Sequence, residues 1–450
     1  MSKDIRIKKG LAINLVGEAK QETAQAPKSK IFTINPPEFL GITPKLLAKE
    51  GTKVLAGDVL FYNKAQERMK FVSPVSGVVK EIVRGERRKV LSIVIEADDT
   101  IAYKDFGKKD AKNASREEVI NQLLASGTWA FVNQKPYEII ANSEETPKAI
   151  FISTFDSAPL AQDYSYTLKE EEKAIQAAVY ALSKLTTGKV YLGLASGRPS
   201  VFDKIEGVEK YKVSGVHPAG NVGVQINKIS PINKGERVWT IKPADLVILG
   251  KVFTEGKFIA ERTIALAGSE VKSPQYYKTI LGSDLTALFN DTITNDNVRI
   301  ISGNALTGTD ISTTKTLTYT DNTISVIPEG DKHRLFGWLP FLTGNDRFSM
   351  SRTNLSWLMP KKKYVLDTNL NGEERALVVT GEMEKVMPMD IFPMQLLKAI
   401  LVDDIDKMEA LGIYEVAPED FALIDFTNTS KLEAQDIIRY GLDLMVKEVG

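Results

Sequence analysis

The residue types that most often carry catalysis or bind metals are scarce in this 450-residue chain. It has no cysteine, and its only histidines are His217 and His333. It therefore cannot form a disulfide, a thiolate nucleophile, a cysteine-ligated iron–sulfur cluster or a three-histidine zinc site. A Ser-His-Asp triad would have only these two histidines as its base, and neither lies in a recognisable nucleophile motif.

Lys70 is a candidate for covalent modification. It follows two glycines six residues apart, Gly51 and Gly57, and precedes a second turn at residues 73–77. Turn residues between short strands in this pattern resemble the biotinyl/lipoyl-like barrel-sandwich fold, in which a modified lysine sits on a hairpin between two similar halves. Lys70 is nearer to that second turn than the carrier lysine is, and Phe71 replaces a methionine of the carrier motif. We therefore favour a surface lysine in a fold kept for structure.

Two loops behind predicted strands lack a phosphate-binding sequence. Residues 154–159 contain no glycine, and Gly193 and Gly197 do not have the spacing of a dinucleotide-binding turn. Both are predicted to be ordinary loops.

The predicted secondary structure that would position these residues changes along the chain, from short strands to alternating strands and helices and then to helices. This indicates a multi-domain protein of the α/β and α+β classes. We predict an N-terminal segment with a barrel-sandwich domain at 1–105, a Rossmann-like α/β domain at 106–255, a β-grasp domain at 256–328 and a mainly helical domain at 329–450.

Within the predicted α/β domain, Ser115 and Glu118 have the spacing of a capping box at the start of a helix. The apolar runs at 149–153, 189–194 and 245–250 are each predicted to be strands.

The charge balance argues against binding to polyanions. Lys plus Arg equals Asp plus Glu at 58 each, so no broad positive field is expected and nucleic acid is not a predicted partner. The sequence has neither a signal-peptide pattern at its start nor a run of 18 apolar residues without charge, so we expect a cytoplasmic chain without a transmembrane helix.

Four phrases, taken in their order and spacing, resemble the A subunits of sodium-translocating NADH:quinone reductases. They are SGVHPAGNVG at 214–223, RIISG at 299–303, GWL at 337–339 and EKVMPMD at 384–390. The opening IRIKKGL at 5–11 is similar too, so the likeness covers essentially the whole chain.

The resemblance implies a peripheral, non-catalytic protein on the cytoplasmic side of the bacterial inner membrane. Its complex belongs to the respiratory chain, oxidises NADH, reduces ubiquinone or another quinone, and transports sodium ions. The implied partners are the B, C, D, E and F subunits, chiefly the membrane-embedded B subunit. The NADH site and the flavins are expected in those other subunits.

The family's fold is related to the C subunit of the Rnf complex and to the flavin-binding subunit of complex I, which hold flavin in a glycine-rich loop. The matching segment here, SGTWAFVNQKPY at 126–137, keeps one glycine and places bulky side chains where backbone would approach a phosphate. Many A subunits carry cysteines near the C-terminus, whereas the matching stretch at 423–431 has none. We expect no covalent cofactor, flavin, iron–sulfur cluster or metal, and an isolated chain that is inactive.

The same segment contains the residue types of a quinone site, which needs an apolar slot, an aromatic wall and one or two hydrogen-bond donors. The candidate quinone contacts are Trp129, Phe131, Gln134, Lys135, Tyr137 and His217. The alternative is that the bulky side chains fill the space a flavin once occupied and that His217 is structural.

Two other functions are open: a carrier or transferase with a modified Lys70, and an electron-transfer protein of the Rnf type. We also predict that the C-terminal region packs against another protein of the complex, because its methionines and aromatic residues exceed what a free surface needs. Those aromatic residues are Trp338, Phe341 and Trp357. The alternative is a self-contained helical core.

Overall fold

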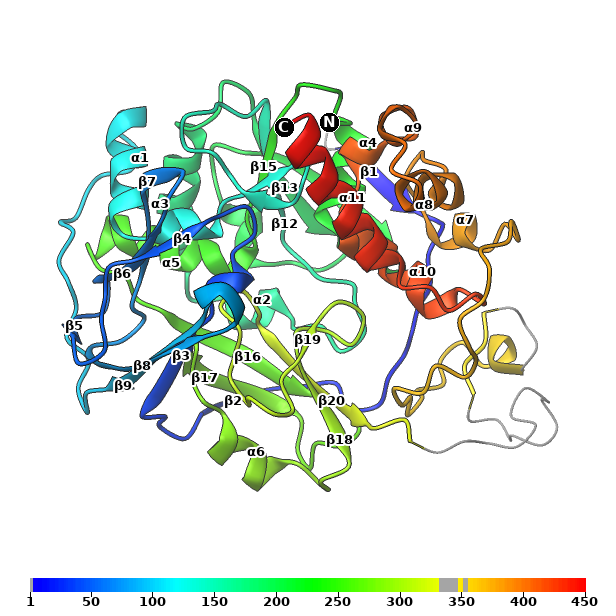
Figure 1. The fold of residues 1–450 in the computed structure, drawn as a ribbon, viewed down its shortest axis with the longest axis horizontal. Coiled ribbons are helices and arrows are strands. Elements are labelled where there is room, and N and C mark those ends of the chain that lie inside the picture. The colour runs from blue at the N-terminus through cyan, green and yellow to red at the C-terminus, as the bar shows by residue number, and fades with distance from the viewer. Residues whose placement is uncertain (1–2, 332–346, 351–354) are drawn as a thin grey trace.

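The structure is a computed structural model that describes residues 3–331, 347–350 and 355–450. Trp338 and Phe341 lie outside the described residues. The described part of the chain contains four sheets, the helices that accompany them and a set of C-terminal helices (Figure 1).

Residues 31–97 form two small sheets of short strands separated by turns, as the turn pattern predicts. One sheet has the order β3 (Ile31–Ile34), β9 (Val90–Ala97), β8 (Gly77–Arg84) and β5 (Lys53–Val54). The other has the order β4 (Pro44–Leu46), β6 (Val59–Asn63) and β7 (Gln66–Val72).

A seven-stranded sheet forms the middle of the molecule. Its order is β1 (Lys3–Ile7), β14 (Glu209–Gly215), β13 (Val190–Ala195), β12 (Ala149–Ser153), β15 (Val238–Thr240), β10 (Asn133–Lys135) and β11 (Ile139–Ile140). The first five strands are parallel, whereas β10 and β11 run antiparallel to their neighbours. The accompanying helices are α1 (Arg116–Ala125), α2 (Tyr164–Thr167), α3 (Glu172–Ser183), α4 (Val222–Ile229) and α5 (Pro243–Thr254).

One predicted strand of this domain is wrong. Residues 245–250 lie in α5, of whose twelve residues ten are buried. A short run of apolar residues fits a buried helix as well as a buried strand, and the proline at the first helical position favours a helix start. The capping box at Ser115 and Glu118 is confirmed, since each residue bonds the other's backbone N–H.

A six-stranded sheet follows in the order β19 (Thr309–Asp310), β18 (Val298–Ser302), β20 (Thr323–Pro328), β16 (Glu261–Ala267), β17 (Gln275–Ile280) and β2 (Lys20–Gln25). Its helix is α6 (Thr286–Thr292). The C-terminal helices are α7 (Met383–Val386), α8 (Pro393–Leu401), α9 (Ile405–Ala410), α10 (Ala422–Thr427) and α11 (Ala434–Glu448).

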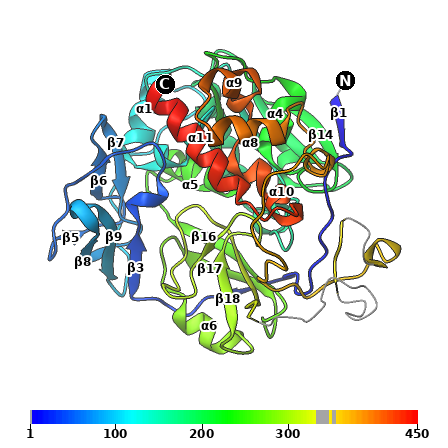
Figure 2. The ribbon, with the colours of Figure 1, turned by 45° about the vertical axis from the view of Figure 1, so that its right-hand side comes forward.

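The N-terminal segment connects the domains. Its strand β1 pairs with β14 at the edge of the seven-stranded sheet, and β2 then pairs with β17 at the edge of the six-stranded sheet. The chain enters the barrel-sandwich domain only at β3 (Figures 1 and 2).

The seven-stranded sheet shares a core with a different neighbour on each face. Helices α1, α3 and α5 pack with the barrel-sandwich domain on one face. On the other face, α4 packs in one hydrophobic cluster with the C-terminal helices α8 and α11, which lie beside it in Figure 2. The inner side of the C-terminal region is therefore covered by this chain itself.

Candidate functional site

The segment predicted to contact quinone begins where α1 ends. Gly127 takes a left-handed conformation with φ of 75°, and a side chain there would meet Val72 of β7 at 2.8 Å. A single 3-10 turn, Thr128–Phe131, then leads into β10. The glycine is thus needed for a turn pressed against the barrel-sandwich domain.

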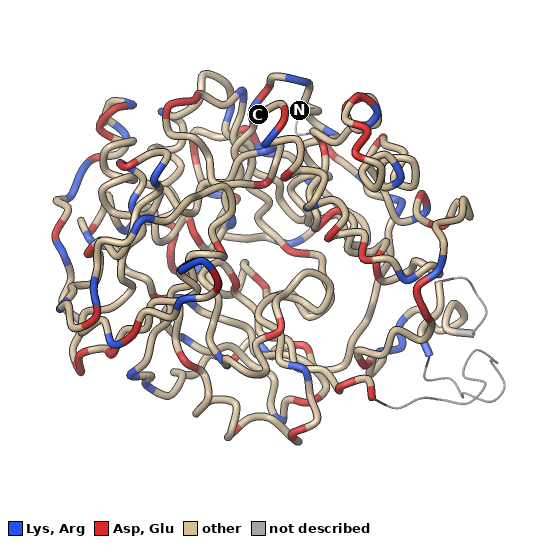
Figure 3. The backbone as a smooth tube through the Cα atoms, in the orientation of Figure 1, with Lys and Arg blue, Asp and Glu red and all other residues tan. Residues whose placement is uncertain are grey.

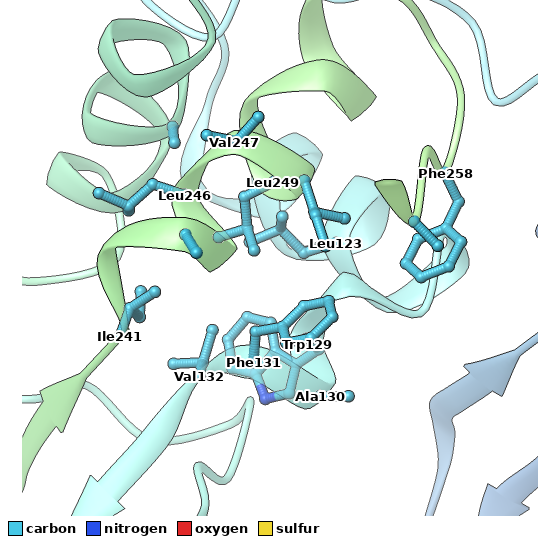
Figure 4. Close-up of a cluster of buried hydrophobic side chains, with 14 of the residues drawn as sticks. Leu123, Trp129, Ala130, Phe131, Val132, Ile241, Leu246, Val247, Leu249 and Phe258 are labelled. Carbon is cyan, nitrogen blue, oxygen red and sulfur yellow. The ribbon is translucent and has the colours of Figure 1, made fainter. Parts of the chain in front are cut away.

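The two candidate aromatic walls are already packed against rings of the same chain. Trp129 is fully buried, donates its indole N–H to the Ala141 carbonyl at 2.7 Å and meets Trp239 edge-on at 5.4 Å. Phe131 is 1% exposed and stacks on Tyr319 with centroids 5.2 Å apart. Figure 4 shows both rings beneath the Leu249 side chain of α5, within the apolar cluster.

Lys135 is a buried charge on the opposite side of the segment. It is 1% exposed, and its ammonium lies 2.5 Å from a Glu138 carboxylate oxygen and 3.9 Å from one of Glu419. Burial lowers the pKa of Lys135, but the negative charges of Glu138, Glu419 and Asp420 outweigh it and raise the pKa above its ordinary value. Lys135 is therefore a fixed cation that joins the α/β domain to the C-terminal region.

Gln134 and Tyr137 are buried beside Lys135. The Tyr137 ring meets Tyr414 of the C-terminal region edge-on at 6.2 Å, and the guanidinium of Arg237 lies over it at 5.5 Å. The side chains of Lys135 and Tyr137 thus face the C-terminal region.

His217 is a buried histidine whose main role in the structure is to order a loop. Its Nδ1 lies 3.1 Å from Ser157 Oγ, which accepts a hydrogen bond from the Gly220 N–H at 2.7 Å. Burial lowers the pKa of His217, with the charge of Asp156 acting against it, so the ring is neutral at pH 7. Ser157 can then donate its proton to Nδ1.

The structure does not gather the six candidate residues around one slot. Trp129 and Phe131 belong to the core shared with the barrel-sandwich domain, whereas Tyr137 belongs to the core shared with the C-terminal helices. All six are buried. This packing favours the alternative in which bulky side chains fill the space, while the quinone assignment stays a prediction.

A cavity of about 310 Å³ lies elsewhere, where the N-terminal segment, the six-stranded sheet and the C-terminal region meet. Its apolar walls include Ile13, Ile301 and Phe426, and its polar residues include Arg299 and Asp310. None of the six predicted residues lines it. Its volume is at the lower end of the range for small-molecule sites.

Comparison with known proteins follows the same domain order. Family models match residues 5–98 as an NqrA N-terminal barrel-sandwich hybrid domain, 114–258 as an NqrA second alpha/beta domain and 263–313 as an NQRA C-terminal domain. The chain is 35% identical over 438 residues to the A subunit of the Na(+)-translocating NADH-quinone reductase of Yersinia pestis bv. Antiqua (strain Angola), a match that covers 97% of this chain and 98% of the relative. It is 34% identical over 447 residues to the protein of the same name from Neisseria meningitidis serogroup B (strain ATCC BAA-335 / MC58), covering 99% and 100%.

The chain belongs to the NqrA family. The barrel-sandwich domain predicted from the turn pattern is confirmed by the family model. Two solved structures of an NAD+-reducing [NiFe]-hydrogenase match at TM-scores of 0.36 and 0.39, with 10% and 8% identity, each covering 75% of this chain and 59% or 62% of the other. That similarity is too low to support an argument about fold.

In this NqrA family member, Lys70 is not at a hairpin tip. It lies inside β7, opposite Tyr62 of β6, and the turn between the two strands is formed by Lys64 and Ala65. This placement argues against the modified-lysine carrier. Within the described ranges, no helix has the length and apolar character to cross a bilayer.

Sequence reasoning missed the buried charges that join the domains of this NqrA family member. Asp245 of α5 and Arg262 of β16 are 2% and 4% exposed and form an ion pair, and Arg262 also donates to Asn322 Oδ1 at 2.7 Å. Asp420, 3% exposed, lies against α4. Neither contact has a local signal, because Asp245 and Arg262 lie on different elements and Asp420 and Gly223 are almost 200 residues apart.

Proposed function

We propose that this chain is the peripheral A subunit of a sodium-translocating NADH:quinone reductase and serves chiefly as a scaffold. The observation that carries the proposal is similarity over nearly the full length of relatives that bear this name, with all three family models in order. Electrons from NADH would pass to quinone through the cofactors of the other subunits, on the cytoplasmic side of the inner membrane.

The finer assignment of the domains is part of this proposal. The parallel strands and flanking helices of the seven-stranded sheet support a Rossmann-like domain. The mixed six-stranded sheet with α6 across it supports a β-grasp module, and α7 to α11 support a helical C-terminal domain.

The outer side of the C-terminal region is our candidate for the contact with a membrane-embedded partner, chiefly the B subunit. Large apolar side chains of the C-terminal region are exposed, among them Val379, Phe392 and Val402 at 63%, 64% and 70% exposure. Exposed apolar side chains support a role in contacts with other proteins. Trp357 is also half exposed. Basic and acidic residues are interspersed along the backbone, which supports a protein partner rather than a polyanion (Figure 3).

Co-purification from solubilised membranes tests both the assignment and the surface. An affinity-tagged chain should recover the other five subunits, and replacing Phe392 and Val402 by serine should reduce that recovery strongly. Leu40→Ser, at an exposed apolar position in the barrel-sandwich domain, is the matched control and should leave recovery unchanged. Recovery of no reductase component by the tagged wild-type chain would contradict the assignment.

The proposal includes a chain without its own flavin or iron–sulfur cluster. The packing of Trp129 and Phe131 supports the absence of a flavin. Their rings are buried against other rings of this chain, and both belong to the segment that matches the flavin loop of the redox relatives. A phosphate-binding loop needs backbone N–H groups that face open space.

Contact with quinone at residues 128–137 would require a change in the packing of this segment. A planar ring could enter only if Phe131 left Tyr319, or if Tyr137 left Tyr414. Photo-crosslinking of the assembled complex with an azido-quinone tests it. Label on 128–137 supports the contact, whereas label confined to other subunits, or to the cavity beside Ile301 and Phe426, contradicts it.

A further inference from the structure

An asparagine–glycine pair lies in an exposed turn of the C-terminal region. Asn371 and Gly372 are both exposed, and no other asparagine of the chain precedes a glycine. Asn369 shapes the turn: its side-chain carbonyl accepts the Asn371 backbone N–H at 2.9 Å, and its backbone carbonyl accepts Asn371 Nδ2 at 2.9 Å. In such a pair the glycine nitrogen can attack the asparagine side-chain carbonyl, because glycine has no Cβ that hinders the approach.

The backbone nitrogen of Gly372 is available for this attack. Gly372 lies outside the helices and strands, and its N–H has no hydrogen-bond partner among the residues that the structure describes. A backbone N–H in a helix or a sheet would first have to break its hydrogen bond before it could reach a neighbouring side chain. Attack by the Gly372 nitrogen therefore needs no unfolding of a regular element.

The side chain of Lys431 passes beside Gly372. A Cβ added to Gly372 would lie 3.2 Å from the Lys431 Cε and 3.6 Å from its Cγ. The two loops are also joined through their backbones. The Arg375 N–H donates to the Ser430 carbonyl at 2.8 Å, and Ser430 Oγ donates to the Ala376 carbonyl at 3.0 Å. The end of the Lys431 side chain is thus held next to the asparagine–glycine turn.

The Lys431 amine has the properties of a base. It is partly buried, and among the described residues no carboxylate offsets that burial. Burial lowers the pKa of Lys431, so a larger fraction of this amine is neutral at mildly alkaline pH than for an exposed lysine. A neutral amine can accept a proton from a neighbouring N–H group as that group attacks.

Arg347 contacts the group that would be attacked. Its Nη2 donates to the side-chain Oδ1 of Asn371 at 3.5 Å, which is a long hydrogen bond. A cation at a carbonyl oxygen stabilises the negative charge that develops on this oxygen during attack at the carbonyl carbon. The turn therefore has a cation at the carbonyl of Asn371 and an amine beside the nitrogen of Gly372.

We propose that Asn371 is a site of self-catalysed deamidation, with Lys431 as the base and Arg347 as the cation that stabilises the oxyanion. Lys431 takes the proton of the Gly372 N–H, and the Gly372 nitrogen forms a bond to Asn371 Cγ. The bond from Cγ to Nδ2 breaks, and Nδ2 leaves as ammonia with the proton returned by Lys431. Water then opens the cyclic imide at either carbonyl to give aspartate or isoaspartate, so the net reaction exchanges ammonia for water.

The reaction would place a carboxylate in the turn that joins these loops. The new negative charge lies next to Arg347 and beside Lys431, whose amine has no carboxylate partner in the described part of the unmodified chain. An opposite charge at this distance favours the charged form of a lysine. Deamidation should therefore strengthen the contact between the two loops.

Peptide mass spectrometry of the purified full-length chain tests the proposal. The folded chain and the same chain in guanidinium chloride are incubated side by side, and the conversion of Asn371 is followed with time. If the fold supplies the base and the cation, conversion should be faster in the folded chain by roughly tenfold or more. The unfolded chain reports the reactivity of the local sequence alone.

Two single variants assign the roles. Lys431→Met and Arg347→Gln should each slow conversion of the folded chain severalfold towards the unfolded rate, while their rates in guanidinium chloride should equal that of the wild type. Lys398→Met, at an exposed lysine of α8, is the matched control and should leave both rates unchanged.

The proposal is overturned if the folded chain converts Asn371 no faster than the unfolded chain, or if either Lys431→Met or Arg347→Gln leaves the folded rate unchanged. If Lys431→Met does not fold, Lys431→Arg decides, since arginine keeps the positive charge but is too basic to accept the proton. Slow conversion in Lys431→Arg supports Lys431 as the base, whereas the wild-type rate contradicts it.

Discussion

Glu38 should make the contact between the barrel-sandwich domain and the domain of the six-stranded sheet sensitive to pH. It lies between β3 and β4, and one carboxylate oxygen accepts the N–H of Tyr319 at 2.8 Å, from the loop that precedes β20. The other accepts from Asn35 Nδ2 at 2.6 Å. Burial raises the pKa of Glu38 to about 7, the hydrogen bonds from Tyr319 and Asn35 oppose the rise, and Asp321 adds a like charge.

The sign of the effect follows from this raised pKa. The carboxyl group is neutral in the folded protein up to about pH 7 but ionises near 4.5 when unfolded. The stability it contributes is therefore complete below pH 4.5 and is lost as pH rises through 7. The pKa difference corresponds to about 3 kcal/mol, and the solvent that still reaches the side chain reduces this to about 2 kcal/mol.

Glu38→Gln should remove this loss, because the amide imitates the neutral acid. We expect the variant to match the wild type near pH 4 and to exceed it by about 2 kcal/mol at pH 8, measured by urea unfolding. Glu118→Gln is a control for which the opposite sign is expected. Hydrogen bonds from Ser115 lower the pKa of Glu118, so replacing this carboxylate should destabilise the folded protein at pH 8. A Glu38→Gln variant that is less stable than the wild type at pH 8 would refute the reasoning.

Three other outcomes are expected. Trp129→Ala should cost about 3–5 kcal/mol of unfolding free energy in urea, because it removes a fully buried ring and its bond to Ala141; a cost below about 1 kcal/mol would show that the ring is not core packing. Asp245→Ala should cost about 3–5 kcal/mol of unfolding free energy, because it leaves Arg262 buried without its charge partner. The double variant Asp245→Leu with Arg262→Met should recover most of this stability. An equal loss of stability in the single and the double variant would contradict this expectation. The purified chain should show no visible absorption band and no NADH oxidation, and stoichiometric flavin after gentle purification would overturn that expectation.

Local patterns predicted local structure well. The capping box at Ser115 is found because its signal lies within one helical turn. The error at α5 arose because an apolar run buried on nearly all sides has no face that distinguishes a helix from a strand.

Contacts between distant parts of the chain could not be predicted in this way. Strands β1 and β2 pair with β14 and β17, more than 200 residues away, and nothing in their own sequence selects these partners. The contact between Asp420 and Gly223 also joins distant parts of the chain and could not be predicted from either segment alone. The sequence shows that the candidate quinone residues are aromatic rings and donors, but their burial against Trp239, Tyr319 and Tyr414 depends on three other segments.

We expect this chain to be a required component of a sodium-translocating NADH:quinone reductase. The most direct measurement is sodium-stimulated NADH:quinone reductase activity in membranes from cells that lack the gene for this chain, with and without the chain restored. The sodium-stimulated activity should be absent without the chain and should return when it is supplied. Full sodium-stimulated activity in the membranes that lack the chain would show that the chain is not a required component.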